Sequence, residues 1–222
     1  MRHFADELGI LQHDLLVMGN VVARSIHRSI SCLLEGSEND GRQVIEDEIR
    51  VNQMQIELDD FVATLMARNQ PVARDMRLLI SVLKINSDLE RMGDLAVNIA
   101  QRSLTLLHES VPETVHLIRK MAEVSEEMVR LSLDAFVQKN ASLAFELLKN
   151  DDEVDRLRDA IYVEVTDAMH RDSANIHIGL GLMSVARNLE RIADHATNIA
   201  EDVIFVVHGA DVRHHRETGA ET

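Results

Sequence analysis

Oxygen-bearing side chains recur every four residues in two stretches, 86–100 (NSDLERMGDLAVNIA) and 186–200 (ARNLERIADHATNIA). No proline interrupts either stretch, and Leu, Met, Ile and Ala recur at helical spacing, so both are predicted to be helices. Residues four apart lie on the same face of a helix. Each helix therefore carries a ladder of oxygen ligands, made of Glu90, Asp94 and Asn98 in the first and Glu190, Asp194 and Asn198 in the second.

Two interpretations of these ladders are open. Like charges four residues apart disfavour a helix by about 0.2–0.5 kcal/mol per pair, so something should offset the repulsion. One interpretation is a solvated face on which Arg91 and Arg191 balance the charge. The other is a bound cation, because hard metal ions take clusters of carboxylate and amide oxygens.

The neighbouring helix of each half carries a matching pair. Glu48 and Asn52 lie four apart upstream of the first ladder, and Asp151 and Asp155 lie four apart upstream of the second. Two adjacent helices would supply four or more side-chain oxygens in each half. This doubling supports a metal site in each half, with the solvated face still open as the alternative. If a metal is bound, an all-oxygen ligand set favours iron, manganese, magnesium or calcium over zinc.

The composition indicates a helical chain. Its 222 residues include 9 Gly and 2 Pro, with only 3% aromatic residues, whereas a sheet protein needs more β-branched and aromatic residues. The net charge of −15 argues against binding to nucleic acid or anionic lipid. No apolar run is long enough to span a bilayer, and the N-terminus lacks a signal-peptide pattern. We expect a cytoplasmic protein with no direct membrane insertion.

Apolar periodicity and turn signals predict six long antiparallel helices. They are expected at about 4–35, 38–68, 71–108, 113–139, 142–170 and 172–209, with Pro71 in the first turn of the third and Asp172 or Ser173 capping the sixth. Short connections make consecutive helices antiparallel neighbours. The fold class is therefore all-α, as two tandem three-helix bundles related by an internal repeat. The predicted bundles are residues 1–110 and 111–209, followed by a disordered polar tail at 210–222.

The chain resembles the PhoU family of phosphate-signalling regulators. The resemblance runs from HFADELGILQHDLLVMG through QPVARDMRLLISVLKI to LERMGDLAVNIA and ARNLERIADHATNIAEDVI, and so covers nearly the whole chain. It implies two similar three-helix bundles with multinuclear metal clusters on E/D-x-x-x-D motifs. It also implies a negative regulator of the phosphate-starvation response. Such a regulator couples the ATPase subunit of the phosphate ABC transporter to a phosphate-sensing histidine kinase, and modulates uptake.

Carried over to this chain, the motif falls on the two ladders and on their counterparts in the neighbouring helices. In the first half Asn52 replaces an acid, so the first site is expected to bind metal more weakly. Asn98 and Asn198 are predicted outer ligands, and Glu201 lies on the same face as Asp194 and could join the second site. His195 lies about 100° around the helix from Asp194 and is interpreted as a partly buried or interface histidine rather than a ligand.

Other functions have weaker support. A ferritin-like di-metal carboxylate oxidoreductase needs paired Glu-x-x-His motifs, and the only instance is Glu113 with His116. The chain contains no phosphate-binding loop, dinucleotide fingerprint or nucleophile elbow, so we do not expect an enzyme. A plain helical scaffold with solvated acidic faces is the third alternative. The long amphipathic faces are consistent with a homodimer.

Overall fold

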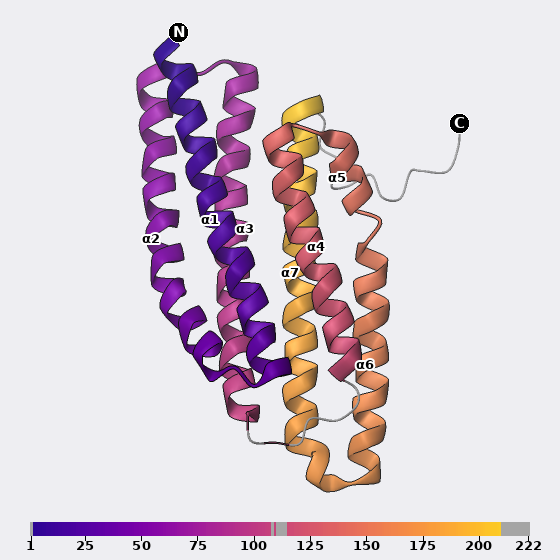
Figure 1. Cartoon of the computed structure of the whole chain (residues 1–222). Coiled ribbons are helices and arrows are strands. Elements are labelled where there is room, and N and C mark those ends of the chain that lie inside the picture. Colours follow the sequence, from indigo (N-terminus) through magenta and orange to yellow (C-terminus); the bar gives the residue numbers. More distant parts are fainter. Residues whose placement is uncertain (1, 108, 110–114, 210–222) are drawn as a thin grey trace, which may run out of the picture.

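The computed structural model describes residues 2–107, 109 and 115–209. Three long antiparallel helices form the first bundle (Figure 1): α1 (Arg2–Glu35), α2 (Glu38–Asn69) and α3 (Ala73–Leu106). The second bundle contains α4 (Val115–Gln138), α5 (Ala141–Leu147), α6 (Asp151–Arg171), the short 3₁₀ turn η1 (Ser173–Asn175) and α7 (Ile176–His208). The described residues contain no strand, and the predicted all-α fold is confirmed. The predicted tail at 210–222 lies outside the described residues.

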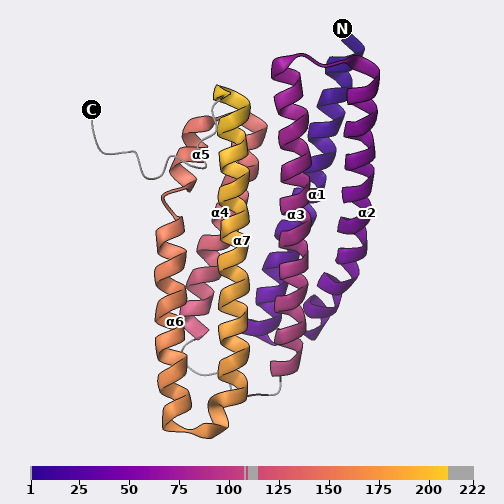
Figure 2. The same ribbon diagram turned by 180° about the vertical axis from the view of Figure 1, so that it is seen from behind.

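The two bundles lie side by side, with α3 and α7 antiparallel at their boundary (Figures 1 and 2). From behind, α6, α7, α3 and α2 form one layer, while α1 and α4 lie in front of it in Figure 1 and contact each other. The two repeats bury the same apolar positions, since Leu89 and Ile99 on α3 correspond to Leu189 and Ile199 on α7. Both helices therefore contribute to one continuous apolar core.

The prediction of one unbroken fifth helix at 142–170 is wrong, because the structure divides this segment into α5 and α6. Asn140 caps α5, since its side chain accepts hydrogen bonds from the backbone N–H groups of residues 142 and 143. A turn follows, and the carbonyl of Asn150 accepts the first backbone bonds of α6. The apolar period does not reveal the break. Leu147 and Val154 are both buried and lie seven residues apart, which is also the spacing of one face in an unbroken helix.

Two helix starts differ from the prediction. Pro71 lies before α3 rather than in its first turn, because Gln70 ends α2 in the left-handed conformation (φ 45°) and Val72 is still extended. Asp172 does act as a cap, but for η1: its carboxylate accepts from the N–H of Ala174, and α7 begins only at Ile176. Ser37 caps α2, because its side chain accepts a hydrogen bond from the backbone N–H of Asp40, and α7 ends before Gly209 as predicted.

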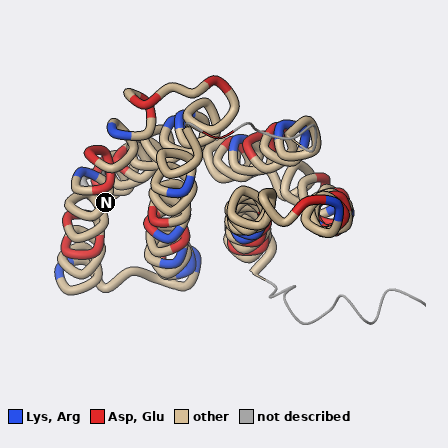
Figure 3. Tube along the Cα trace, turned by 90° about the horizontal axis from the view of Figure 1, so that it is seen from below, with Lys and Arg blue, Asp and Glu red and all other residues tan. Residues whose placement is uncertain are grey.

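None of the described helices has a stretch that is both long and apolar enough to cross a membrane. Viewed along the helix axes, acidic residues occur on both bundles (Figure 3). The acidic charge of the molecule is therefore spread over both repeats.

Candidate functional site

The two ladders have the same pattern of burial. The first residue of each ladder, Glu90 or Glu190, is half-buried. The two residues that follow it are exposed in both helices: Asp94 and Asn98 on α3, and Asp194 and Asn198 on α7. Between them, corresponding apolar residues are buried in both helices: Leu89 and Leu189, Ala96 and Ala196, Ile99 and Ile199. The sequence repeat is thus a structural repeat, in which the core side of each helix fixes the direction of its acidic side.

The first acidic cluster, defined here as Glu48 and Asn52 on α2 with Glu90 and Asp94 on α3, joins two helices of the first bundle. Burial raises the pKa of Glu90, and the neighbouring carboxylates of Asp94 and Glu48 raise it further, while Arg91 opposes them. The structure therefore brings the predicted acids of α2 and α3 within electrostatic reach of each other. A cation placed among them would relieve the repulsion.

Asn52 has an unsatisfied acceptor in this cluster. Its Oδ1 atom is buried and has no hydrogen-bond partner among the described residues. A buried carbonyl oxygen without a partner costs about 1–3 kcal/mol. The amide oxygen is a donor type that hard cations accept, so this position fits a metal ligand.

The second acidic cluster, Asp151 and Asp155 on α6 with Glu190 and Asp194 on α7, differs because it contains an arginine. The guanidinium of Arg158 donates to Asp155 at 2.9 Å, to Glu190 at 2.5 Å and to Asp159 at 2.8 Å. It therefore links α6 to α7 and neutralises part of the cluster. The packed helices partly desolvate the Asp194 carboxylate and so raise its pKa, and the neighbouring carboxylates of Glu190, Asp151 and Asp155 raise it further.

Sequence reasoning missed Arg158. Counted from the aligned positions Glu48 and Asp151, it corresponds to Gln55 in the first half, so the repeat itself predicts no cation there. A usable signal was its position three residues after Asp155, where a helix brings side chains together. Only the packing of α6 on α7 shows that the same guanidinium also reaches Glu190.

The other predicted ligands are placed differently. Asn98 lines a polar cavity of about 370 Å³ between α3 and α7, together with Arg102, Ser184 and Asn188. Asn198 is exposed and Glu201 is half-buried on α7. Among the described residues, no three His, Cys, Asp or Glu side chains converge closely enough to hold a metal ion. Metal binding at either cluster would require side chains to turn inward.

His195 does not join the second cluster. Its Nδ1 atom lies 2.8 Å from Oδ1 of Asp88 on α3, and both residues are buried where the bundles meet. The interpretation as an interface histidine is confirmed. Of the Glu-x-x-His pair, Glu113 lies outside the described residues, and His116 is exposed at the start of α4.

Comparison with known proteins matches both repeats. The family model described as PhoU domain matches residues 15–103 and 118–203, which include every candidate ligand. The phosphate-specific transport system accessory protein PhoU homolog of Pseudomonas putida is 37% identical over 96% of this chain and 84% of its own length.

Two crystal structures are similar in fold along almost their entire length. PhoU from Pseudomonas aeruginosa has a TM-score of 0.90 and 36% identity, covering 93% of this chain and 100% of that one. The phosphate transport system regulatory protein PhoU from Streptococcus pneumoniae has a TM-score of 0.87 and 28% identity, covering 94% and 99%.

Proposed function

The chain belongs to the PhoU family, and we propose that it couples the phosphate ABC transporter to a sensor histidine kinase and keeps the phosphate-starvation response off. Membership makes it an accessory or regulatory protein of phosphate transport rather than an enzyme. The observation that carries the proposal is the match of both repeats, with relatives of that described role similar over nearly the whole chain.

The proposed mechanism is that of a cytoplasmic adapter. One surface docks the ATPase subunit of the transporter, another docks the kinase, and a change in one contact biases the other. What supports this is the architecture of two packed bundles, since the extensive α3–α7 boundary would transmit strain between their outer surfaces. A homodimer would present each docking surface twice, and we propose this assembly for the working state.

We further propose that the acidic clusters bind hard cations such as iron, manganese, magnesium or calcium, with zinc less favoured. Glu48, Asn52, Glu90 and Asp94 would hold the cation in the first half, and Asp151, Asp155, Glu190 and Asp194 in the second. A bound cation supplies positive charge that joins two helices. Support comes from the raised pKa of Glu90 and of Asp194 and from the buried, unpartnered Oδ1 of Asn52.

The order of affinity follows from Arg158. The sequence-based expectation of a weaker first site considered only the missing charge of Asn52. In the second cluster, however, Arg158 already pairs with Asp155 and Glu190, so a cation must compete with it. We therefore propose that the first cluster binds the cation more tightly.

Deletion of the encoding gene tests the regulatory role. We expect a starvation reporter such as alkaline phosphatase to stay on in high phosphate, and reintroduction of the intact chain to switch it off. Normal repression in the deletion strain would contradict the role. Binding of the purified chain to the transporter's ATPase subunit tests the adapter mechanism, and no binding at tens of micromolar would contradict it.

The metal content of untagged, chelator-free protein tests the clusters. We expect the double variant Glu90→Ala, Asp94→Ala to lose more metal than the matched variant Glu190→Ala, Asp194→Ala. Equal losses would contradict the order of affinity. A wild-type chain without metal after exposure to each cation, and with stability unchanged by it, would contradict the sites themselves.

A further inference from the structure

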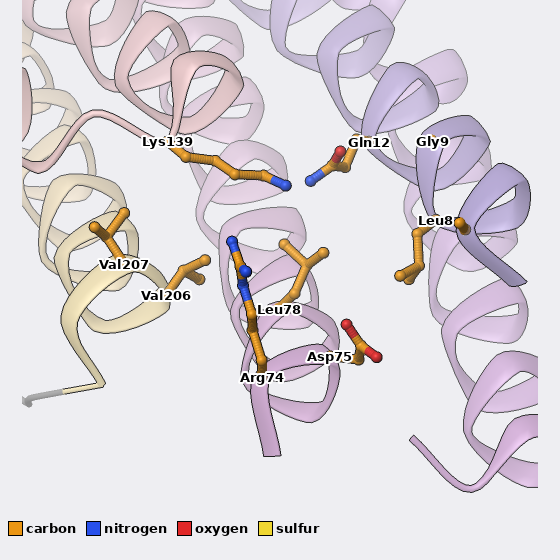
Figure 4. A pocket seen from close by; sticks show the side chains of 10 residues that line it. Leu8, Gly9, Gln12, Arg74, Asp75, Leu78, Lys139, Val206 and Val207 are labelled. Carbon is orange, nitrogen blue, oxygen red and sulfur yellow. The ribbon is translucent and has the colours of Figure 1, made fainter. Parts of the chain in front are cut away.

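A second kind of site lies far from the acidic clusters along the helices. A cavity of about 470 Å³ opens between the two bundles at the end where α1 and α3 begin and α4 and α7 end (Figure 4). That volume is within the range of about 300–1,000 Å³ typical of small-molecule sites. Both repeats contribute to its walls, so a bound ligand would touch both bundles.

Nitrogen-bearing side chains converge on this cavity from three helices or helix ends. Figure 4 shows the amine of Lys139 and the amide of Gln12 pointing toward each other across it, with the guanidinium of Arg74 extending toward the same space. Within residues 2–107, 109 and 115–209, neither Arg74 nor Lys139 forms an ion pair. In a chain of net charge −15, two such cations facing one cavity provide the charge for an anion.

A third cation reinforces the positive potential. Arg77, one turn along α3 from Arg74, packs its guanidinium against Gly209 at the C-terminus of α7. Its Nε atom is buried without a hydrogen-bond partner among the described residues. The negative end of the α7 dipole partly offsets this charge, so Arg77 contributes to the local field while Arg74 and Lys139 remain available for a ligand.

Lys139 occupies a backbone position at which glycine is usual. It follows the last residue of α4 with φ +49°, a left-handed conformation that costs a residue with a side chain about 1 kcal/mol. Gln70 ends α2 in the same way, so the conformation alone does not mark a site. It does allow the side chain and the backbone to be tested separately, because glycine removes the amine and suits the conformation.

Apolar side chains line the same cavity. Leu78 and Val206 are buried residues that lie on either side of the Arg74 side chain in Figure 4, with Val207 beyond Val206 and Leu8 beyond Leu78. The carboxylate of Asp75 also lines the cavity, and in Figure 4 it lies on the α1 side, away from Lys139. A ligand suited to this lining carries both an anionic group and an apolar body.

We propose that this cavity binds a small phosphomonoester. Its phosphoryl group meets Arg74, Lys139 and the Gln12 amide, and its apolar part packs on Leu78 and Val206. A phosphomonoester carries about −1.5 to −2 charges at pH 7, which matches two cations better than a single carboxylate does. Arginine and lysine are the side chains that proteins use most for phosphoryl oxygens. The proposal does not depend on the acidic clusters or on coupling to a kinase.

Titration of the full chain with phenyl phosphate, followed by ligand-observed NMR or calorimetry, tests the site. We expect phenyl phosphate to bind more tightly than inorganic phosphate, benzoate or phenol. Arg74→Gln and Lys139→Gly should each weaken binding about tenfold or more, and Asp75→Asn should strengthen it. The matched control is Arg24→Gln, an exposed arginine on α1 outside the cavity, which should leave binding unchanged.

Stability measurements separate binding from folding. Lys139→Gly should unfold at the same or a higher temperature than the wild-type chain, so its loss of binding cannot come from a damaged fold. Three outcomes would overturn the proposal: no binding of phenyl phosphate at several millimolar, unchanged affinity in both cavity variants, or an equal loss in Arg24→Gln.

Discussion

His195 on α7 and Asp88 on α3 lie 2.8 Å apart, Nδ1 to Oδ1, and are both buried at the boundary of the two bundles. The internal repeat does not duplicate this pair. The residues one hundred positions away are Asn188 and Leu95, which cannot form an ion pair. The boundary between the repeats is therefore asymmetric, with the carboxylate–imidazole contact toward one end of the α3–α7 packing and the polar cavity lined by Asn188 toward the other.

Replacing Asp88 with Ala should destabilise the protein. The substitution leaves a buried imidazole without its partner, which costs about 1–3 kcal/mol. The loss should appear as a lower midpoint of urea unfolding. Because the contact joins the two bundles, its loss in Asp88→Ala should also increase hydrogen exchange along the facing surfaces of α3 and α7.

The repeat supplies a control for this prediction. The double variant Asp88→Asn, His195→Leu copies the residue types found at Asn188 and Leu95. It leaves no ionisable side chain at this contact, so it should be more stable than His195→Leu alone, in which Asp88 loses its partner. Additive effects of the two single substitutions would show that the pair contributes no coupling energy.

Replacing Arg158 with Gln should have opposite effects on metal-free and metal-bound protein. Without metal, Glu190 and Asp155 lose their shared cation, so the melting temperature should fall. With metal, the second cluster no longer competes with a guanidinium, so its affinity should rise. Calorimetric titration with manganese or magnesium measures the affinity, and thermal unfolding in chelator measures the stability.

Arg156→Gln is the matched control for Arg158→Gln. Arg156 is exposed on the same helix and pairs with Glu153 at 3.0 Å, outside the second cluster. It should change neither metal affinity nor stability by more than about 0.5 kcal/mol. A metal affinity unchanged by Arg158→Gln would show that Arg158 does not compete for this site.

Replacing Asn52 with Asp gives the first cluster the acid that aligns with it in the second, Asp155. The added charge repels Glu48 four residues away, which alone costs about 0.2–0.5 kcal/mol. Burial of the new carboxylate adds to this cost, so the metal-free variant should be less stable. The same charge should tighten metal binding, which calorimetry would detect. Asn69→Asp, near the end of α2 and outside the cluster, is the control that should not gain affinity. An unchanged affinity in Asn52→Asp would argue against Asn52 as a ligand.

The helical fold and the paired acids could be predicted because both depend on local spacing. The four-residue ladders and the apolar frame around Leu89 and Leu189 fix which side of α3 and α7 faces the core. Once two such helices pack on α2 and α6, the acids of adjacent helices must approach one another. The repeat then predicts two clusters from one pattern.

Features that depend on packing between bundles or on a single turn could not be read in the same way. The break before α6 leaves the apolar period intact between Leu147 and Val154. The acidic run that begins at Asp151 was nevertheless a signal of a new helix start, because acids are favoured at a helix N-terminus. The Asp88–His195 contact spans 107 residues and has no copy in the repeat. The cavity beside Arg74 and Lys139 forms only where four helix ends meet.

Replacing Glu90 with Gln should stabilise the metal-free protein at neutral pH. Burial and neighbouring acids raise the pKa of Glu90 in the folded chain above its ordinary value of 4.5. The protonated carboxyl therefore stabilises the folded chain below pH 4.5, and this stabilisation is lost as the pH rises through the raised pKa. Glutamine removes this loss. Urea unfolding in chelator should therefore favour the variant at pH 7.5, with a difference that shrinks toward pH 4.5.

Excess divalent metal should reverse this order. The cation binds the folded wild-type chain and stabilises it by mass action, whereas the variant lacks one charged ligand and gains less. Glu164→Gln, an exposed substitution on α6, should show neither effect. If Glu90→Gln remained the more stable protein with saturating metal, Glu90 would be an unfavourable buried acid without a cation partner, and the first cluster would not be a metal site.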